Sequence, residues 1–583
     1  MEVRGVFKGF ARGKRFGFIT PDDGSPDIFM HESALPRGRR PPIGTPVTCV
    51  IEPSAKGPRA VSVQFIETLP MAPAPAAQTA PPTHRAVSRE VSAEPRDEKL
   101  LSENVEQLDA KDVSMDVLRE IAQWKREAKA EDNERYFWHV READEISKGD
   151  KYFVIGRKGS GKTAICEYFN KQTGFDLFAE KLSFKSFPFN ELYAQKNEKF
   201  TAPNQFITIW KYLIYSTVCR LMLRNQAVDG ELRAELSRLY DDQTPLSRRI
   251  SKWVGKEFGF SLFGLSIKVT NSDSKAPKKW TEHVDFLEDL LLRHAGGATY
   301  FVLFDELDED YRDLVESNQS QQYSALITSL FKAVQDVRTI FDKQLRVYPV
   351  IFLRDDIYEI VQDSDKNKWG DFRVDLNWDA EKIKRLIAFR ISRAIDPHCK
   401  VTLPFDTAWS KMFGSRPIGV GGRKNMISTF EFIGRSTLLR PRDFVTYLQN
   451  CAQHAFENNV HISPQVVKVV DKAFSNYLRQ ELTDELFAVL PDIANIFDAI
   501  SQLRKWNFSI PELESAYRQQ VENGFIKEKN VKFVLQVLFL FSVIGNTPRV
   551  GRYVFRYLNR EARLNFNERV VVHRGLFKAL QIL

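Results

Sequence analysis

The sequence has few of the features that mark secreted, zinc-binding or membrane-anchored proteins. Five cysteines are scattered over 583 residues without C-x-x-C spacing, which excludes a disulfide framework or a cysteine zinc site and predicts a reducing, cytoplasmic setting. The first residues lack the apolar segment of a signal peptide, and no stretch reaches the roughly 18 apolar residues of a membrane span. We therefore expect no membrane contact. Histidine, serine and acidic residues also form no hydrolytic triad or nuclease carboxylate set.

What is present is typical of a multidomain globular protein. Hydrophobic residues make up 43% and charged residues 27% of the chain, which is enough for sizeable cores. The length favours roughly three or four domains. The net charge of +8 and the pI near 9.0 indicate either an anionic partner or a solvated surface with a small excess of lysine and arginine.

Composition and periodicity divide the chain into six segments. Residues 1–69 contain short strands separated by glycine, proline and aspartate, which predicts a small β-barrel. Six prolines and seven alanines in residues 70–95 predict an extended linker. Residues 96–145 are predicted to be a helical lead-in, and residues 146–395 an α/β core with an insertion at about 225–280. Residues 396–475 are predicted to form a helical lid, and residues 476–583 helices followed by a basic β-hairpin.

Apolar strands alternate with helical stretches in the central part of the chain. The runs Tyr152–Ile155, Thr299–Phe304 and Val347–Leu353 are continuous apolar segments, as is typical of strands buried on both faces. Because helical stretches separate them, we predict a parallel α/β sheet. Residues 203–224 are predicted to form a mostly buried helix.

A glycine-rich segment follows the first of these strands and precedes a predicted helix. Residues 156–163 fit the pattern G-x-x-x-x-G-K-[ST] in full. Glycines let main-chain N–H groups surround a phosphate, and the helix N-terminus favours the same negative charge. Lys162 can reach the β- and γ-phosphates, and the Thr163 hydroxyl can bind Mg²⁺. The predicted nucleotide-binding residues are Gly156, Arg157, Lys158, Gly159, Ser160, Gly161, Lys162 and Thr163.

Two carboxylates end the second strand, and an arginine ends the third. Asp305 is predicted to bind Mg²⁺, and Glu306 to polarise the water that attacks the γ-phosphate. Arg354 follows a central strand, at the carboxyl end where ligands bind in open α/β sheets. It either contacts the γ-phosphate or pairs with the neighbouring Asp355 or Asp356.

These motifs together resemble the additional-strand P-loop NTPases, and among them the KAP and STAND ATPases and their bacterial relatives of the phage-defence type. The resemblance covers roughly residues 130–460. The segment Leu438–Phe444 resembles a lid-helix motif of KAP and origin-recognition ATPases, which implies that Arg442 is a second phosphate sensor. The resemblance also implies ATP with Mg²⁺ as the nucleotide, and it assigns catalytic roles to Lys162, Glu306, Arg354 and Arg442.

Aromatic and basic residues alternate along two predicted strands of the N-terminal barrel. A period of two places Lys14, Phe16 and Phe18 on one face. Phe29 and His31 likewise share a face of the next strand. Apolar residues at the alternate positions fill the core, so the aromatic residues beside a lysine predict a stacking platform for single-stranded bases.

Residues 1–66 resemble a cold-shock domain, a small OB-fold, through the segments Gly5–Ile19, Ile28–His31 and Gly57–Ala60. Two positions depart from the family pattern, because Gly9 stands where a stacking tryptophan is usual and Arg15 replaces a glycine. The loss of one stack removes about 1–3 kcal/mol of binding free energy. The resemblance implies that single-stranded RNA or DNA binds at Lys8, Lys14, Phe16, Phe18, Phe29 and His31.

The C-terminal domain resembles a winged helix, which many of these ATPases append. A winged helix binds duplex DNA or packs on the lid, and the spacing of its basic residues fits a solvated face equally well. These basic residues are Arg549, Arg552, Arg556, Arg560, Arg563, Arg569, Arg574 and Lys578.

The leading hypothesis is a nucleic-acid-binding ATPase that couples ATP binding and hydrolysis to conformational change or assembly. A role in bacterial defence is implied by the resemblance. The alternatives are a STAND-like nucleotide switch with little turnover and a nucleic-acid-dependent motor, which the lack of a helicase motif series disfavours. A homo-oligomer and a separate effector protein stay open as partners. Arg390 and Arg393 are candidates for an arginine finger across such an assembly, with an ordinary salt-bridged helix face as the alternative.

Overall fold

The chain forms two compact units, Met1–Glu98 and Lys99–Leu583. The predicted linker at 70–95, most of the predicted insertion and Lys14 lie outside the described residues. The computed structural model describes residues 2–10, 16–23, 25, 28–31, 34–35, 45–54, 57–65, 114–172, 174–185, 189–193, 199–240, 280–308, 320–341, 345–414, 416–420, 425–548 and 551–582.

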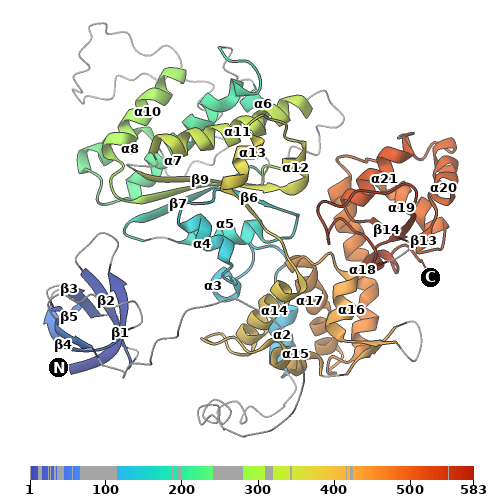
Figure 1. The fold of residues 1–583 in the computed structure, drawn as a ribbon, viewed down its shortest axis with the longest axis horizontal. Coiled ribbons are helices and arrows are strands. Elements are labelled where there is room, and N and C mark those ends of the chain that lie inside the picture. Colours follow the sequence, from blue (N-terminus) through green and yellow to red (C-terminus); the bar gives the residue numbers. More distant parts are fainter. Residues whose placement is uncertain are drawn as a thin grey trace, which may run out of the picture. The chain divides into compact units, whose positions relative to one another are not determined.

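The N-terminal unit is a closed five-stranded barrel, as predicted, with the strand order β1-β2-β3-β5-β4 (Figure 1). Its strands are β1 (Glu2–Phe10), β2 (Phe16–Pro21), β3 (Ile28–His31), β4 (Pro46–Ser54) and β5 (Gly57–Phe65). Strands β2 and β3 are antiparallel, and their register places Phe18 opposite Phe29 and Phe16 opposite His31. The barrel core consists of Phe7, Ile19, Ile28, Met30, Val47, Cys49, Ala60 and Val63.

The second unit contains a five-stranded sheet with the order β10-β6-β9-β8-β7. Its strands are β6 (Phe153–Gly156), β7 (Leu177–Ser183), β8 (Thr299–Asp305), β9 (Arg346–Arg354) and β10 (Arg373–Asp375). All neighbouring strands pair in parallel, as predicted. Strand β9 lies between the strand that precedes the glycine-rich loop and the strand that ends in Asp305. Strands β7 and β10 were not predicted.

Helices cover both faces of this sheet (Figure 1), with α7, α10 and α11 on one face and α4 and α5 on the other. Their bounds are α4 (Arg141–Ser147), α5 (Lys162–Lys171), α6 (Phe189–Tyr193), η2 (Asn204–Phe206), α7 (Ile207–Arg224), α8 (Gly230–Leu239), α10 (Trp280–His294), α11 (Ser320–Phe341), α12 (Asp355–Ile360), α13 (Lys366–Trp369) and η4 (Gly370–Phe372). Among the described residues, Asn204–Arg224 is the one helix long and apolar enough to cross a membrane. Because 78% of its apolar window is buried inside the protein, it is the core helix that the sequence predicts.

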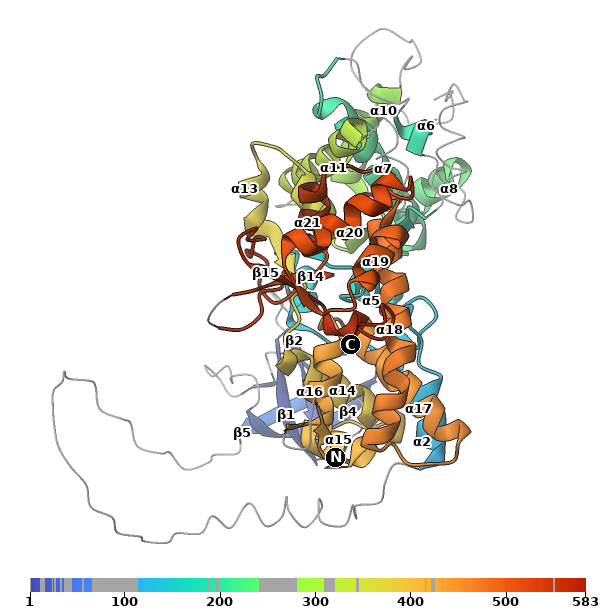
Figure 2. The ribbon, with the colours of Figure 1, turned by 90° about the vertical axis from the view of Figure 1, so that its right-hand side faces the viewer.

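A helical lid follows the sheet and includes part of the predicted lead-in. It consists of α2 (Met115–Ala122), α3 (Asn133–Tyr136), α14 (Ala380–Ile395), α15 (Phe405–Phe413), the hairpin β11 (Ile418–Gly419) and β12 (Met426–Ile427), α16 (Thr429–Ser436), α17 (Pro441–Glu457) and α18 (Pro464–Leu486). Helix α2 lies alongside α17 (Figure 2), and Leu118 shares a buried cluster with Phe444 and Leu448. The same buried cluster includes residues of α14, so the lid begins before residue 396, where it was predicted to start. It also ends later than the predicted residue 475, because α18 continues to Leu486.

The last domain has the element order of a winged helix. Its elements are α19 (Ile493–Gln502), β13 (Asn507–Phe508), α20 (Ile510–Glu522), α21 (Val531–Leu540), β14 (Ile544–Thr547), β15 (Arg569–Val572) and η5 (Arg574–Leu576). The three strands form a sheet in the order β13-β15-β14. We call residues 551–568, the described part of the connection between β14 and β15, the wing. Helix α21 turns a largely uncharged face outward, with Lys532, Phe533, Gln536 and Leu540 exposed.

Candidate functional site

The glycine-rich loop adopts a conformation that only small residues permit. Gly159 and Gly161 have φ angles of +78° and +98°, a region that residues with a Cβ rarely adopt. A Cβ on Gly156 would lie 2.5 Å from the Ser160 hydroxyl. Helix α5 starts immediately afterwards at Lys162. The loop and the first turn of α5 therefore form a curved cradle of the shape that the motif predicts, and phosphate binding there stays a prediction.

Lys162 lies folded back into this cradle. Its Nζ donates to the main-chain oxygens of Gly156, at 2.9 Å, and of Arg157, at 3.0 Å. Burial lowers the pKa of Lys162, while the charges of Asp308 and Asp355 oppose that effect. The ammonium group is thus held by neutral acceptors, which a phosphate oxygen can replace with a stronger, charge-assisted hydrogen bond.

Asp305 ends strand β8 as a buried carboxylate. Its exposed fraction is 2%, and its Oδ2 lies 2.9 Å from the Nζ of Lys181 on the neighbouring strand β7. Lys181 also pairs with Glu167 of α5 at 2.8 Å. This charge network fixes Asp305 beside the first turn of α5, where the motif needs a metal-binding carboxylate.

Glu306 follows directly in a strained backbone conformation. Its φ of +62° is unusual for a residue with a side chain and is found mostly at functional sites. Its carboxylate lies 2.8 Å from the Nζ of Lys129 and accepts a short hydrogen bond from the Ser183 hydroxyl. Burial raises the pKa of Glu306, but the hydrogen bonds from Lys129 and Ser183 and the charge of Lys181 lower it below its ordinary value.

Arg354 pairs with its neighbour Asp356, which is one of the two alternatives that the sequence left open. Its guanidinium donates to both oxygens of Asp356, at 3.0 and 2.6 Å, and to Asp308 at 3.3 Å, yet it also lines the same cavity as the glycine-rich loop. Burial opposes its charge, but Asp356 and Asp308 raise its pKa well above the ordinary value. The acidic residue Asp308, which the sequence did not single out, thus helps to hold Arg354 at the strand end.

The N-terminus of lid helix α17 lies on the glycine-rich loop. The main-chain N–H of Arg442 donates to the oxygen of Gly159 at 3.4 Å, and its guanidinium lies 3.3 Å from Glu481. Arg440 is fully buried and donates to Glu485 at 2.7 Å and to the main-chain oxygen of Lys158 at 3.3 Å. The sequence motif singled out Arg442 and missed Arg440, although both arginines flank the same proline.

A cavity of about 470 Å³ is lined by residues 158–163 of the loop together with other predicted site residues from separate parts of the chain, whereas Arg157 lines a second cavity. The polar lining of the first cavity includes Lys162, Thr163, Asp305, Glu306, Arg354 and Arg442. Aromatic side chains form another part of its wall: Phe137, Trp138 and Trp378. The rings of Trp138 and Trp378 lie 6.0 Å apart, and the Trp378 Nε1 donates to the Ser160 oxygen at 2.8 Å. The cavity can therefore hold a ligand that combines negatively charged groups with an aromatic ring.

The residues fit a Mg²⁺ ion that arrives together with a phosphate. Thr163 and Asp305 line the same cavity, and the buried Asp305 carboxylate is held there by Lys181. No group of three or more His, Cys, Asp or Glu side chains among the described residues could hold a metal alone. Mg²⁺ commonly needs only one or two protein ligands beside phosphate and water, so Thr163 and Asp305 are a sufficient set.

Arg390 does not fit the predicted arginine finger. It is buried, pairs with Glu131, and lies over the rings of Trp124 and Tyr136 at 4.5 and 4.7 Å. Such a side chain cannot reach across to another subunit without breaking a buried ion pair, so the salt-bridged alternative is correct. Arg393 donates to the main-chain oxygen of Pro397 at 2.9 Å.

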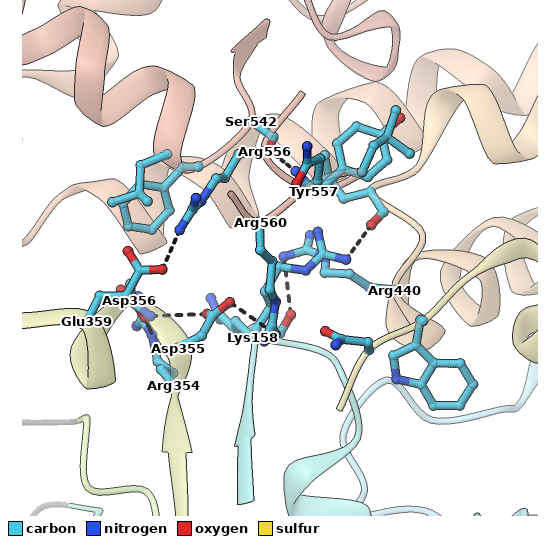
Figure 3. Close-up of a pocket in the computed structure, with 18 of the residues that line it drawn as sticks. Lys158, Arg354, Asp355, Asp356, Glu359, Arg440, Ser542, Arg556, Tyr557 and Arg560 are labelled. Atoms are coloured by element: carbon cyan, nitrogen blue, oxygen red, sulfur yellow. Dashed lines mark hydrogen bonds and ion pairs between the residues drawn. The ribbon is translucent and has the colours of Figure 1, made fainter. Parts of the chain in front are cut away.

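A second cavity, of about 550 Å³, lies between the strand ends, the lid and the winged-helix domain (Figure 3). Arg556 of the wing pairs with Glu359 of α12. Arg560 lies 2.9 Å from Asp375 and 3.4 Å from Asp355. Two of the basic residues predicted to form a solvated or DNA-binding face therefore bind the α/β core.

The glycine-rich loop itself contacts the wing. The Arg157 guanidinium lies 5.9 Å from the centre of the Tyr557 ring and donates to the main-chain oxygen of Leu438 at 2.9 Å. Burial and the nearby charge of Arg440 lower the pKa of Arg157 to about 10. One residue of the phosphate cradle thus contacts both the lid and the wing.

The barrel carries its own candidate surface. Phe18 is 37% exposed, Phe29 is half-buried and Lys8 is exposed. The rings of Phe18 and Phe29 lie 6.1 Å apart at 80°, and neither belongs to the barrel core. The main chain pairs Phe16 with His31 beside them. The predicted platform residues thus occur on adjacent strands β2 and β3, while Lys14 and Arg15 lie outside the described residues.

Comparisons with known proteins match two parts of the chain. Residues 3–66 match the family described as the "'Cold-shock' DNA-binding domain", and residues 381–483 match the "FunZ-associated C-terminal helical domain", which corresponds to α14–α18. The cold shock-like protein CspB of Escherichia coli is 44% identical over 64 residues, covering 11% of this chain and 90% of CspB.

Longer similarities are weaker. The "Putative transposon gamma-delta 80.3 kDa protein" of Escherichia coli is 21% identical over 460 residues, which cover 73% of this chain. The match spans 62% of that protein's length. The solved structure of Drosophila ORC bound to DNA aligns over 86% of this chain and 97% of that chain, with 10% identity and a TM-score of 0.25. We draw no conclusion from that structural likeness.

Proposed function

Residues 3–66 belong to the cold-shock domain family, and we propose that the chain as a whole is a nucleic-acid-binding ATPase. The barrel binds single-stranded RNA or DNA. The α/β unit binds ATP with Mg²⁺ in the cavity above the sheet and hydrolyses it. The lid and the winged-helix domain respond to the nucleotide by changing conformation or assembly.

The observation that carries the proposal is the convergence of six side chains in one cavity. Lys162, Thr163, Asp305, Glu306, Arg354 and Arg442 line it from four separate segments of the chain. Together they offer a cation for the β- and γ-phosphates, a hydroxyl and a carboxylate for Mg²⁺, a base for water, and two arginines for the charge that develops during phosphoryl transfer. The aromatic wall formed by Phe137, Trp138 and Trp378 suits a purine ring.

The contacts of the wing support a coupling between nucleotide and conformation. Asp355 directly follows Arg354, and Asp375 ends strand β10 beside the loop strand β6. Arg560 binds both carboxylates, and Tyr557 lies against Arg157. A phosphate that moves Arg157 or Arg354 therefore disturbs residues that hold the wing.

The proposal is tested by measuring ATP turnover of the full chain with and without single-stranded RNA or DNA at low salt. We expect single strands to bind and to change the rate. The Lys162→Ala variant should show no turnover while still binding the strands, because its barrel is unaltered. Unchanged turnover together with an absence of binding would defeat the proposal.

A nucleotide switch with little turnover is the second candidate. It is favoured by the contacts of Glu306, whose carboxylate is engaged by Lys129 and Ser183. Such a switch retains its nucleotide through purification and turns it over slowly. Release of bound nucleotide by denaturation, followed by its identification, distinguishes the two candidates.

Assembly, an effector protein and a role in bacterial defence are proposed from the family resemblance. If ATP drives assembly, then the mass of the particle in solution should rise on addition of Mg·ATP. An unchanged mass at all nucleotide states would restrict the response to conformational change within one chain.

Reversing the charge of the wing arginines should loosen the wing. In the double variant Arg556→Glu/Arg560→Glu, three ion pairs with Glu359, Asp355 and Asp375 become repulsive contacts. Partly exposed pairs contribute up to about 1 kcal/mol each, so we expect several-fold faster amide exchange in residues 551–563. Hydrogen exchange with mass spectrometry measures this directly. Arg552→Glu, an exposed wing residue, is the matched control, and equal exchange in both variants would contradict the role of these pairs.

A further inference from the structure

A lysine from the lead-in reaches the carboxylate that is placed to activate water. Lys129 lies between α2 and α3, and its Nζ is 2.8 Å from both carboxylate oxygens of Glu306. The two residues are 177 positions apart in the chain, and no motif marks Lys129. Neighbouring residues of the same segment, Ala128 and Glu131, line the nucleotide cavity. The ammonium group is therefore presented to the site from its lid side.

The main chain around Lys129 is held firmly, whereas its side chain is partly free. The Asn133 side chain donates to the oxygen of Ala128 at 2.7 Å, and the buried pair of Glu131 with Arg390 fixes the segment to α14. Trp124 is buried in the lid cluster. The Lys129 side chain is 39% exposed. A lysine of this kind can exchange one anionic partner for another without moving its backbone.

The present partners occupy much of the hydrogen-bonding capacity of Glu306. An ionised carboxylate offers about four acceptor sites on its two oxygens, and a base needs one of them free for the proton of water. Lys129 contacts both oxygens of Glu306, and the Ser183 hydroxyl takes one of them as well. Release of Lys129 therefore gives an incoming water access to both oxygens of Glu306.

A nucleoside triphosphate supplies the charge that can release it. Its terminal phosphate is the group that Glu306 faces in the proposed site, and it adds negative charge where a diphosphate adds none. A phosphate with several anionic oxygens is a stronger partner for an ammonium group than one carboxylate. If Lys129 were absent, the terminal phosphate and the Glu306 carboxylate would be two negative charges close together. No cation would offset their repulsion in this partly desolvated site.

We propose that Lys129 discriminates triphosphate from diphosphate by moving from Glu306 to the terminal phosphate of bound ATP. The inference rests on the proposed function and names a binding residue for it. Once Lys129 has moved, Glu306 accepts a proton from the attacking water. The water oxygen forms a bond to the γ-phosphorus, the bond from the γ-phosphorus to the bridging oxygen breaks, and ADP leaves with that electron pair. When the phosphate departs, Lys129 returns to Glu306.

The first test compares the affinities of AMP-PNP and ADP, both with Mg²⁺, for the full chain. In Lys129→Ala we expect AMP-PNP to bind about ten-fold more weakly, as loss of a charge-assisted contact predicts, while the Kd for ADP stays within two-fold. Lys129→Arg should recover most of the AMP-PNP affinity. Lys148→Ala, an exposed lysine at the end of α4, should match the parent chain for both nucleotides.

The second test removes the carboxylate that Lys129 contacts. In a Glu306→Gln background, AMP-PNP should bind more tightly than to the parent chain, and only while Lys129 is present.

The outcomes separate this inference from the proposed function. Equal loss of ADP and AMP-PNP binding in Lys129→Ala, or no loss of either, overturns the role of Lys129 and leaves the ATPase proposal intact. A parent chain that binds neither nucleotide defeats the ATPase proposal itself. A selective loss of AMP-PNP binding in Lys129→Ala, together with tighter AMP-PNP binding in Glu306→Gln, supports both.

Discussion

Replacing Glu306 by glutamine should reduce ATP turnover by about 10²–10⁴-fold while ATP stays bound. The amide keeps the size and the hydrogen-bonding shape of the side chain but cannot accept the proton of the attacking water, and a positioned base contributes an acceleration of this order. Lys162, Thr163 and Asp305 are unaltered and hold the phosphates and the metal. Single-turnover measurement of ATP cleavage, beside a filter-binding assay of retained ATP, separates the chemical step from binding.

The control for this variant is a glutamate outside the cavity. Glu381→Gln changes an exposed carboxylate in the first turn of α14 and should turn ATP over at the parent rate. If Glu306→Gln hydrolyses ATP within a few-fold of the parent chain, then Glu306 is not the base. If the parent chain is itself as slow as the variant, the nucleotide switch becomes the better description.

The parts of the site that the sequence predicted lie on short contiguous motifs. The loop at 156–163 and the pair Asp305–Glu306 each follow a buried strand, and both the strand and the motif are local properties of a few residues. A parallel sheet brings the carboxyl ends of its strands to one edge, so Arg354 could be assigned to the same edge. The barrel could also be predicted from the sequence, because the alternation of apolar and aromatic residues along its strands distinguishes its two faces.

The partners of these residues could not be predicted, because they depend on tertiary neighbours. Lys181 and Ser183 come from β7, whose mixed polar and apolar sequence carries no buried-strand pattern, and β7 pairs with β8 only in the folded sheet. Lys129 reaches Glu306 from a segment without any motif. The charges of Arg556 and Arg560 are visible in the sequence, but their binding to the α/β core requires the placement of the whole winged-helix domain.

Removing two aromatic side chains from the barrel should strongly weaken the binding of single-stranded nucleic acid. Phe18 and Phe29 lie opposite each other on β2 and β3, contact each other edge to face, and are not among the barrel-core residues. Aromatic side chains on such a surface stack on bases of any sequence, and each stack contributes about 1–3 kcal/mol. We therefore expect Phe18→Ala/Phe29→Ala to weaken binding of single-stranded oligo-dT or oligo-U by at least about 30-fold, as measured by fluorescence anisotropy.

A matched variant and a salt series show whether stacking is the cause. Val50→Ala removes another exposed apolar side chain, on β4, and should leave affinity unchanged. Charge-driven binding to the phosphates, which Lys8 and other basic residues provide, depends on the logarithm of the salt concentration. Because the double variant removes no charge, its affinity should fall by the same factor at every salt concentration, with the slope preserved. A changed slope with little loss of affinity would mean that the strand binds another, more basic face of the barrel.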